Sequence, residues 1–165
     1  MSEVIGIDPG KSGGIASIND VGRIITAKMP TTTRDLYELI DSLATAGSRV
    51  FVESVHAGPK MGSCAAFKFG QGVGEIHMAC IALELPVHYV SPQKWQRALG
   101  LLSKARGLGE GDTAKKNHNK ARAQELFPGI KITHHIADAL LIAEYGRREL
   151  SGVRSSCCGS STGSP

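Results

Sequence analysis

Cysteine and aromatic residues are both scarce in this chain of 165 residues, which has four cysteines and 5% aromatic residues. Cys64 and Cys80 lie in an apolar stretch, whereas Cys157 and Cys158 are adjacent in the C-terminal segment. The sequence contains no Cys-x-x-Cys spacing, so it indicates neither a disulfide framework nor a cysteine-ligated zinc site. We therefore expect reduced thiols.

Long hydrophobic runs and a large charge imbalance are also missing. No uninterrupted apolar stretch approaches the roughly 20 residues that a membrane span requires, and no basic segment precedes the first apolar run. We expect a soluble cytoplasmic chain without a membrane partner. The net charge of +4 permits a polyanionic partner without identifying one.

The remaining composition is that of a globular domain, with 41% hydrophobic and 21% charged residues. We expect residues 1–150 to form one domain and the Ser-, Gly- and Cys-rich residues 151–165 to form a disordered tail.

Short apolar runs bounded by turn residues predict a mixed α/β fold. The predicted strands are 4–7, 14–18, 23–27, 49–53 and 86–90, with a short extended piece at 130–133. The first three strands would form an antiparallel meander. Helices alternate with the later strands, which predicts a mixed sheet whose faces are covered by helices.

Apolar periodicity and capping residues predict these helices. The first would begin near Arg34 with Thr33 as its N-cap, and residues 61–85 would form mostly one buried helix. Glycines at 70, 72 and 74 indicate that another helix or nucleic acid approaches this helix closely. Further helices are expected at 91–99, before Pro128 and at 135–150, with a loop over most of 101–119.

Three acidic residues stand where such a fold would bring them together. Asp8 ends the first strand, Glu53 ends the fourth, and Asp138 lies in the first turn of the last helix. If the two strands are neighbours, their carboxyl ends place Asp8 and Glu53 at the same edge. Carboxylates with phosphate oxygens suit Mg²⁺, and paired metals about 3.5–4 Å apart can activate water for phosphodiester hydrolysis.

Each acid also has a structural explanation. Asp8 before Pro-Gly is a common turn residue, and Asp138 near a helix start would interact favourably with the helix dipole. Glu53 is harder to explain in this way, because acids seldom follow a buried run such as Val-Phe-Val. His135 precedes Asp138 by three residues, which places both on one helical face. His134 is an alternative candidate at this position.

The order of these motifs resembles that of RuvC-type Holliday junction resolvases, which belong to the RNase H-like superfamily. The resemblance spans roughly residues 3–147 and rests on the following motifs: Ile5-Gly6-Ile7-Asp8-Pro9-Gly10, Val52-Glu53, Gly70-Gln71-x-x-Gly74, Glu84-Leu85-Pro86-Val87 and His135-x-x-Asp138-Ala139-Leu140. Residues 95–127 are closer to divergent phage and organellar members than to bacterial ones.

The resemblance implies an RNase H-like mixed five-stranded sheet flanked by helices, and a homodimeric endonuclease that nicks four-way DNA junctions. It implies Mg²⁺, with Mn²⁺ as a substitute, bound by Asp8, Glu53 and Asp138. His135 matches a family position that is either Asp or His, where it would bind metal or transfer a proton. The location implied is a bacterial cell or a phage-infected host.

Two groups of residues are candidates for DNA contact. Residues 91–125 carry eight basic and three acidic side chains, a net charge of +5, and the candidates there are Lys104, Arg106, Lys115, Lys116 and Lys120. The second group follows Glu53 and comprises Lys60, Phe67, Lys68, Phe69 and Gln71. The two phenylalanines cannot share a helical face, so one is expected in the core and one against DNA. Trp95 is expected in the core.

Three alternatives remain open. One is a nuclease of the same fold that acts on other branched DNA. Another is a non-catalytic module that binds branched DNA, although clustered acids repel phosphate unless a metal offsets them. The third is an actin-like or sugar-kinase ATPase, since Asp8-x-Gly10 is typical of those proteins too. Such ATPases need two related domains, so we expect no nucleotide cofactor.

Overall fold

The structure is a computed structural model that describes residues 3–55, 58, 61–102 and 112–157. Strands and helices follow one another in the order β1 (Glu3–Asp8), β2 (Gly14–Asn19), β3 (Ile24–Lys28), α1 (Thr33–Leu43), β4 (Arg49–Glu53), α2 (Ser63–Ala82), β5 (Val87–Val90), α3 (Pro92–Ala98), α4 (Asp112–Leu126) and α5 (His134–Cys157).

The strands form one five-stranded sheet in the order β3-β2-β1-β4-β5. The first three strands pair antiparallel, whereas β4 pairs parallel with both β1 and β5. The predicted mixed sheet and its antiparallel meander are therefore confirmed. Because β1 and β4 are parallel neighbours, their carboxyl ends lie at the same edge of the sheet.

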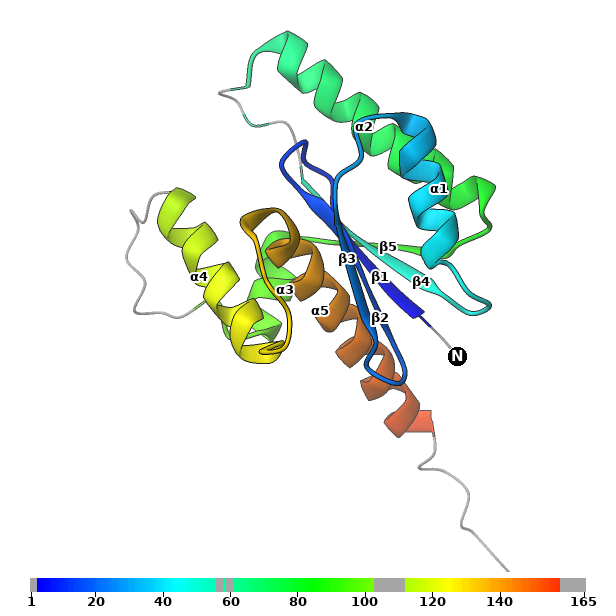
Figure 1. Cartoon of the computed structure of the whole chain (residues 1–165), viewed down its shortest axis with the longest axis vertical. Helices are drawn as coiled ribbons and strands as arrows, with labels where there is room; N and C mark the ends of the chain where they lie inside the picture. The colour runs from blue at the N-terminus through cyan, green and yellow to red at the C-terminus, as the bar shows by residue number, and fades with distance from the viewer. Residues whose placement is uncertain (1–2, 56–57, 59–60, 103–111, 158–165) are drawn as a thin grey trace, which may run out of the picture.

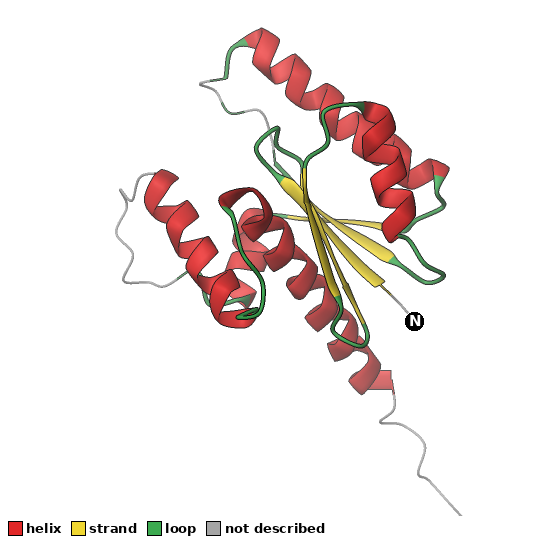
Figure 2. Cartoon of the chain, in the orientation of Figure 1, coloured by secondary structure: helices red, strands yellow, loops and turns green. Residues whose placement is uncertain are grey.

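Helices cover both faces of the sheet, with α1 and α2 on one side and α3, α4 and α5 on the other (Figures 1 and 2). Alternate residues of β1 supply the two cores, as the period of a strand requires. Ile5 and Ile7 belong to the cluster that includes Ile40 of α1, and Val4 belongs to the one that includes Leu140 of α5.

Helix α5 packs directly on the sheet because small residues lie at the contact. A Cβ atom at Gly6 of β1 would overlap the backbone of Ala139 and Ala143. One at Gly146 would meet the ring of Phe51 on β4. This close approach sets the position of α5 against the carboxyl ends of β1 and β4.

Helix α2 differs from the prediction of a buried helix. Its buried residues are Ile76, Ala79 and Cys80, and much of the remaining surface is exposed. No atom would lie within 4 Å of a Cβ atom at Gly70, Gly72 or Gly74, so no other helix of the described chain approaches these glycines. Apolar residues occur all round α2, and only one narrow stripe of them faces the sheet and α1.

Several element boundaries also differ from the sequence prediction. The N-cap of α1 is Thr32, whose hydroxyl accepts a hydrogen bond from the Asp35 amide, so the prediction of Thr33 was wrong by one residue. Helix α4 begins at Asp112, inside the predicted loop, and residues 130–133 form no strand. Residues 103–111 lie outside the described residues.

Helix α5 begins at His134 and continues to Cys157, seven residues beyond the predicted end at Leu150. The prediction of a disordered tail is therefore wrong for residues 151–157, and residues 158–165 lie outside the described residues. Among the described residues, no helix combines the length and the apolar composition that a bilayer span would need.

Candidate metal and DNA site

Strand pairing brings the first two acidic residues together. Ile7 of β1 is opposite Val52 of β4, so the next residues, Asp8 and Glu53, end adjacent parallel strands. The turn after β1 also contacts the Asp8 carboxylate, because the backbone amide of Gly10 donates a hydrogen bond to it. This is the juxtaposition that the strand order predicted.

Asp138 reaches the same edge from α5. Asp138 is the fifth residue of the helix. The sequence-based prediction that it lies in the first turn was therefore wrong. The helix dipole acts mainly within the first turn. A favourable interaction with this dipole therefore does not explain why an acid stands at position 138. The close packing of α5 on β1 sets the position of this carboxylate.

The three carboxylates act on one another electrostatically. Burial, followed by repulsion from Asp138, raises the pKa of Asp8 to about 6. Burial is also the main cause for Glu53, whose pKa rises to about 7, with further repulsion from Asp8 and Asp138. Burial raises the pKa of Asp138 as well. The structure therefore brings all three predicted acids close enough to influence one another electrostatically, and we refer to these partly buried residues as the carboxylate cluster.

Two neutral side chains hold the cluster by hydrogen bonds. The indole Nε1 of Trp95 donates to Glu53 Oε1 at 2.9 Å, and Asn119 Nδ2 donates to Asp138 Oδ1 at 2.9 Å. Trp95 is fully buried, as predicted, but its donor role was not foreseen, and Asn119 was not a candidate at all. Both bonds lower the pKa of their carboxylate partners and oppose the effect of burial.

The two histidines at the start of α5 have different surroundings. His135 Nδ1 lies 2.7 Å from the backbone oxygen of Ser12, in the turn that follows Asp8. A carbonyl oxygen only accepts, so Nδ1 donates its proton to this bond, and Nε2 is the ring nitrogen that faces away from it. His134 is exposed, and its charge lowers the pKa of Asp138. The structure thus orients His135 and leaves His134 at the surface.

The donor set fits a hard divalent cation. Mg²⁺ and Mn²⁺ prefer oxygen ligands, and partly buried carboxylates that repel one another are stabilised by nearby positive charge. Gly13 packs closely against Asp8, since a Cβ atom there would overlap the backbone oxygen of Asp8 and lie 2.9 Å from its Oδ2. In the described part of the chain, no three Asp, Glu, His or Cys side chains are placed to ligate one ion together. The assignment of a metal therefore rests on the chemistry and mutual repulsion of these residues.

The basic candidates lie partly beside this cluster. Lys115 and Lys116 are exposed on α4, and the charge of Lys116 lowers the pKa of both Asp8 and Asp138. Lys120 on the same helix is half-buried. Lys60, Lys104 and Arg106 lie outside the described residues.

The aromatic candidates on α2 differ from the expected pair of one core and one DNA-facing ring. Phe67 is 75% exposed, and Phe69 is half-buried. Phe69 lines a groove of about 680 Å³ together with Pro9, Gly10 and Lys68. The groove therefore begins at the turn that follows Asp8. Gln71 is exposed and donates a hydrogen bond to Glu75.

Comparison of the whole chain with solved structures identifies its fold. The structure of Thermus thermophilus RuvC in complex with a Holliday junction substrate matches with a TM-score of 0.60 and 18% identity, covering 90% of this chain and 96% of RuvC. A second Thermus thermophilus RuvC structure matches with a TM-score of 0.58 and 19% identity, covering 89% and 96%. The chain has the RuvC fold.

The RuvC match confirms the predicted RNase H-like fold and extends over nearly the whole length of the solved RuvC chain. The low identity agrees with the expected divergence from bacterial members. No protein-family model and no curated protein matches the sequence of this chain.

Proposed function

We propose that this chain is a metal-dependent, structure-selective endonuclease that resolves four-way DNA junctions by hydrolysing a pair of phosphodiester bonds. The observation that carries the proposal is the cluster of Asp8, Glu53 and Asp138, which converges from two parallel strands and a distant helix. A RuvC structure with the same fold is bound to a Holliday junction, which supports a branched DNA substrate.

The three carboxylates would hold Mg²⁺ or Mn²⁺, with His135 as a fourth residue. When bound, such an ion lowers the pKa of a coordinated water and offsets charge on the phosphate. Asp8, Glu53 and Asp138 would bind and orient the cation. The ring of His135, which is held by its bond to Ser12, presents Nε2 for metal binding or proton transfer. Burial of the carboxylates strengthens these interactions, because water screens them less.

The DNA would approach the cluster along α4 and the groove beside α2. Lys115, Lys116 and Lys120 on α4 neutralise phosphates, and Lys116 acts closest to the carboxylates, since its charge already influences Asp8 and Asp138. Phe69 and not Phe67 is the ring that contacts DNA, because the groove it lines begins at the turn after Asp8. Lys60, Lys68, Gln71, Lys104 and Arg106 remain further candidate contacts.

A second copy of this chain would supply the second nick. Phe67, Met78 and Ile81 lie along one face of α2 and are 75%, 60% and 53% exposed. This face is opposite the buried residues of α2, and Gly70 and Gly74 lie on it with open space above them. An apolar helix face with small residues suits a self-complementary twofold contact, so we assign it to the homodimer.

A gel assay tests the proposed function. A mobile four-way junction, a replication fork and a plain duplex are each incubated with the protein in Mg²⁺, in Mn²⁺ and in EDTA. We expect cleavage of the four-way junction in either metal, no cleavage in EDTA, and no cleavage of the duplex. Equal cleavage of the fork would favour the broader branched-DNA nuclease, and binding without cleavage would favour a non-catalytic module.

The activity also implies a cytoplasmic location, in a bacterial cell or a phage-infected host.

A further inference from the structure

We propose that Trp95 and Asn119 are positioning residues that hold Glu53 and Asp138 in the orientation in which these carboxylates bind a divalent cation. This inference rests on the proposed function, because it concerns the same carboxylate cluster. It assigns a role to two residues that neither carry charge nor belong to the motifs of the RuvC-type resemblance.

Trp95 directs its only polar atom at Glu53. The residue lies in α3 and is fully buried, and its indole nitrogen can donate but not accept. The partner is 42 residues away in the sequence, at the end of β4. A bond to Oε1 alone fixes the rotation of the carboxylate and leaves Oε2 outside this contact.

Asn119 makes the equivalent contact to Asp138 from a different helix. It is 8% exposed, and its amide nitrogen donates to Oδ1 of Asp138 on α5. Lys115 and Lys116 are exposed on the same helix. Helix α4 thus presents basic residues to solvent and an amide donor to the carboxylate.

The neutrality of both donors is what makes them suitable for a metal site. An arginine or lysine at either position would orient the carboxylate as well, but it would also neutralise the charge that attracts the cation. A neutral N–H fixes the geometry and preserves the negative charge. Outer hydrogen-bond partners of metal ligands act in this way, and their loss typically lowers metal affinity or activity about 10- to 100-fold.

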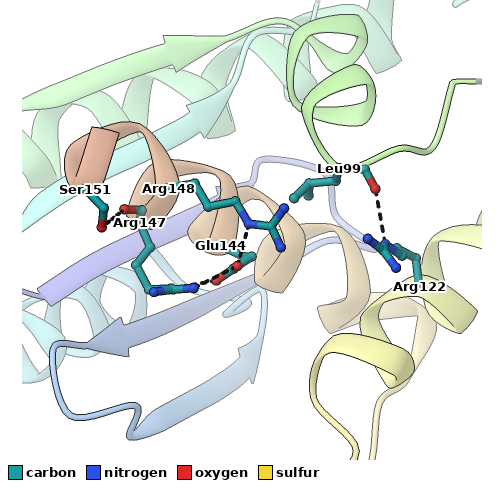
Figure 3. A network of polar contacts seen from close by, with 6 residues as sticks. All are labelled: Leu99, Arg122, Glu144, Arg147, Arg148 and Ser151. Atoms are coloured by element: carbon teal, nitrogen blue, oxygen red, sulfur yellow. Dashed lines mark hydrogen bonds and ion pairs between the residues drawn. The ribbon is translucent and has the colours of Figure 1, made fainter. Parts of the chain in front are cut away.

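The two helices that supply the donors both pack on α5, and a hydrogen bond links them. Arg122 Nε of α4 donates to the backbone oxygen of Leu99 at the end of α3, at 3.1 Å (Figure 3). Trp95, Leu99 and Ala123 are buried in the same core cluster. Both donors therefore reach their carboxylates from the same side of the sheet (Figure 1).

The experiment measures metal affinity without relying on cleavage. Melting temperatures of the wild type, Trp95→Phe and Asn119→Leu are recorded over a range of Mn²⁺ concentrations. The apparent dissociation constant for Mn²⁺ is obtained from the rise of the melting temperature with Mn²⁺ concentration. Tyr145→Phe is the matched control, since Tyr145 is 2% exposed in the same core cluster and contacts neither carboxylate in the described structure. Junction binding in EDTA is measured in parallel.

We expect the two substitutions to weaken Mn²⁺ binding about 10- to 100-fold, while Tyr145→Phe changes it less than about twofold. Junction binding in EDTA should stay within about twofold of the wild type in all variants, because both donors are buried and bonded to carboxylates.

Unchanged Mn²⁺ affinity in both variants, or an equal loss in Tyr145→Phe, would overturn the positioning role even if the wild type cleaves junctions normally. If Trp95→Phe does not fold, Asn119→Leu alone decides the outcome. Failure of the proposed function looks different: the wild type itself would show neither Mn²⁺ binding nor cleavage of a four-way junction.

Discussion

The carboxylate of Asp138 on α5 repels that of Asp8 on β1, although the two residues stand near opposite ends of the sequence. Burial adds to this repulsion, and Glu53 experiences both effects. The folded chain therefore maintains a concentration of negative charge that the unfolded chain would disperse.

This concentration predicts an unusual dependence of stability on pH. The folded-state pKa of Asp8 is about 6, against 3.8 ordinarily, and that of Glu53 is about 7, against 4.5. Between about pH 4 and pH 7 the folded chain binds more protons than the unfolded chain, so the contribution of these groups to stability falls as pH rises. Without metal, Asp8→Asn or Glu53→Gln should therefore stabilise the protein at pH 8 by about 3 kcal/mol.

Thermal unfolding in EDTA at pH 4 and pH 8 measures this effect. Each of the two substitutions should raise the melting temperature by roughly 6–12 °C at pH 8 and have little effect at pH 4. Asp41→Asn, which removes an exposed acid of α1, is the control and should change neither value. Destabilisation by Asp8→Asn and Glu53→Gln at pH 8 would show that the carboxylates do not oppose folding.

Neutralising the exposed lysines of α4 should weaken junction binding and its dependence on salt. Each phosphate contact contributes about 0.9 to the slope of log affinity against log salt, so Lys115→Gln with Lys116→Gln should reduce the slope by about 2. Arg49→Gln is a matched control, because this exposed cation begins β4, at the end opposite Glu53. An unchanged slope in the double variant would remove α4 from the DNA contact.

A charge on the outer face of α2 should dissociate the dimer. Met78→Glu or Ile81→Glu would place a carboxylate in the apolar contact, and analytical ultracentrifugation should then show a monomer. Val21→Glu is the control, since Val21 is 71% exposed in the turn between β2 and β3, away from α2. The monomer should lose paired nicking of the junction. A chain that stays dimeric after both substitutions must associate through another face.

The two histidines should differ in their effect on cleavage. His135→Ala removes a ring whose Nδ1 is bound to the Ser12 carbonyl, and it should lower cleavage about 100-fold if Nε2 takes part in the reaction. His134→Ala removes an exposed ring and should change the rate only a few-fold. Single-turnover cleavage of a four-way junction measures both rates. Equal losses of cleavage rate in the two variants would show that the bond to Ser12 does not give His135 a special role in the reaction.

Local patterns were sufficient to predict the sheet and the shared edge at which Asp8 and Glu53 lie. The run Arg49–Glu53 is short, apolar and ended by an acid, and it forms β4 with those bounds. The adjacency of β1 and β4 was a condition in the sequence analysis, and their parallel pairing satisfies it. Three consecutive threonines, Thr31 to Thr33, lie at the start of α1, and each has a side chain able to cap a helix, so composition alone did not distinguish Thr32 from Thr33.

Features that depend on packing between distant elements could not be predicted. Asn119 lies in a polar basic segment, and its role appears only because α4 packs against α5 beside Asp138. The exposure of α2 was also missed, since apolar residues around the whole helix do not reveal which of its faces the sheet covers. Phe67 was expected to share the core or contact DNA, and it lies on the uncovered face.

The central claim is that Asp8, Glu53 and Asp138 act together through a divalent cation to cleave a DNA junction. Its most direct test is single-turnover cleavage of a labelled four-way junction in Mg²⁺ by Asp8→Asn, Glu53→Gln and Asp138→Asn, with junction binding measured on the same samples. The account predicts at least about a 100-fold loss of cleavage in each variant, with binding preserved. Cleavage at the wild-type rate by any one of the three folded variants would contradict it.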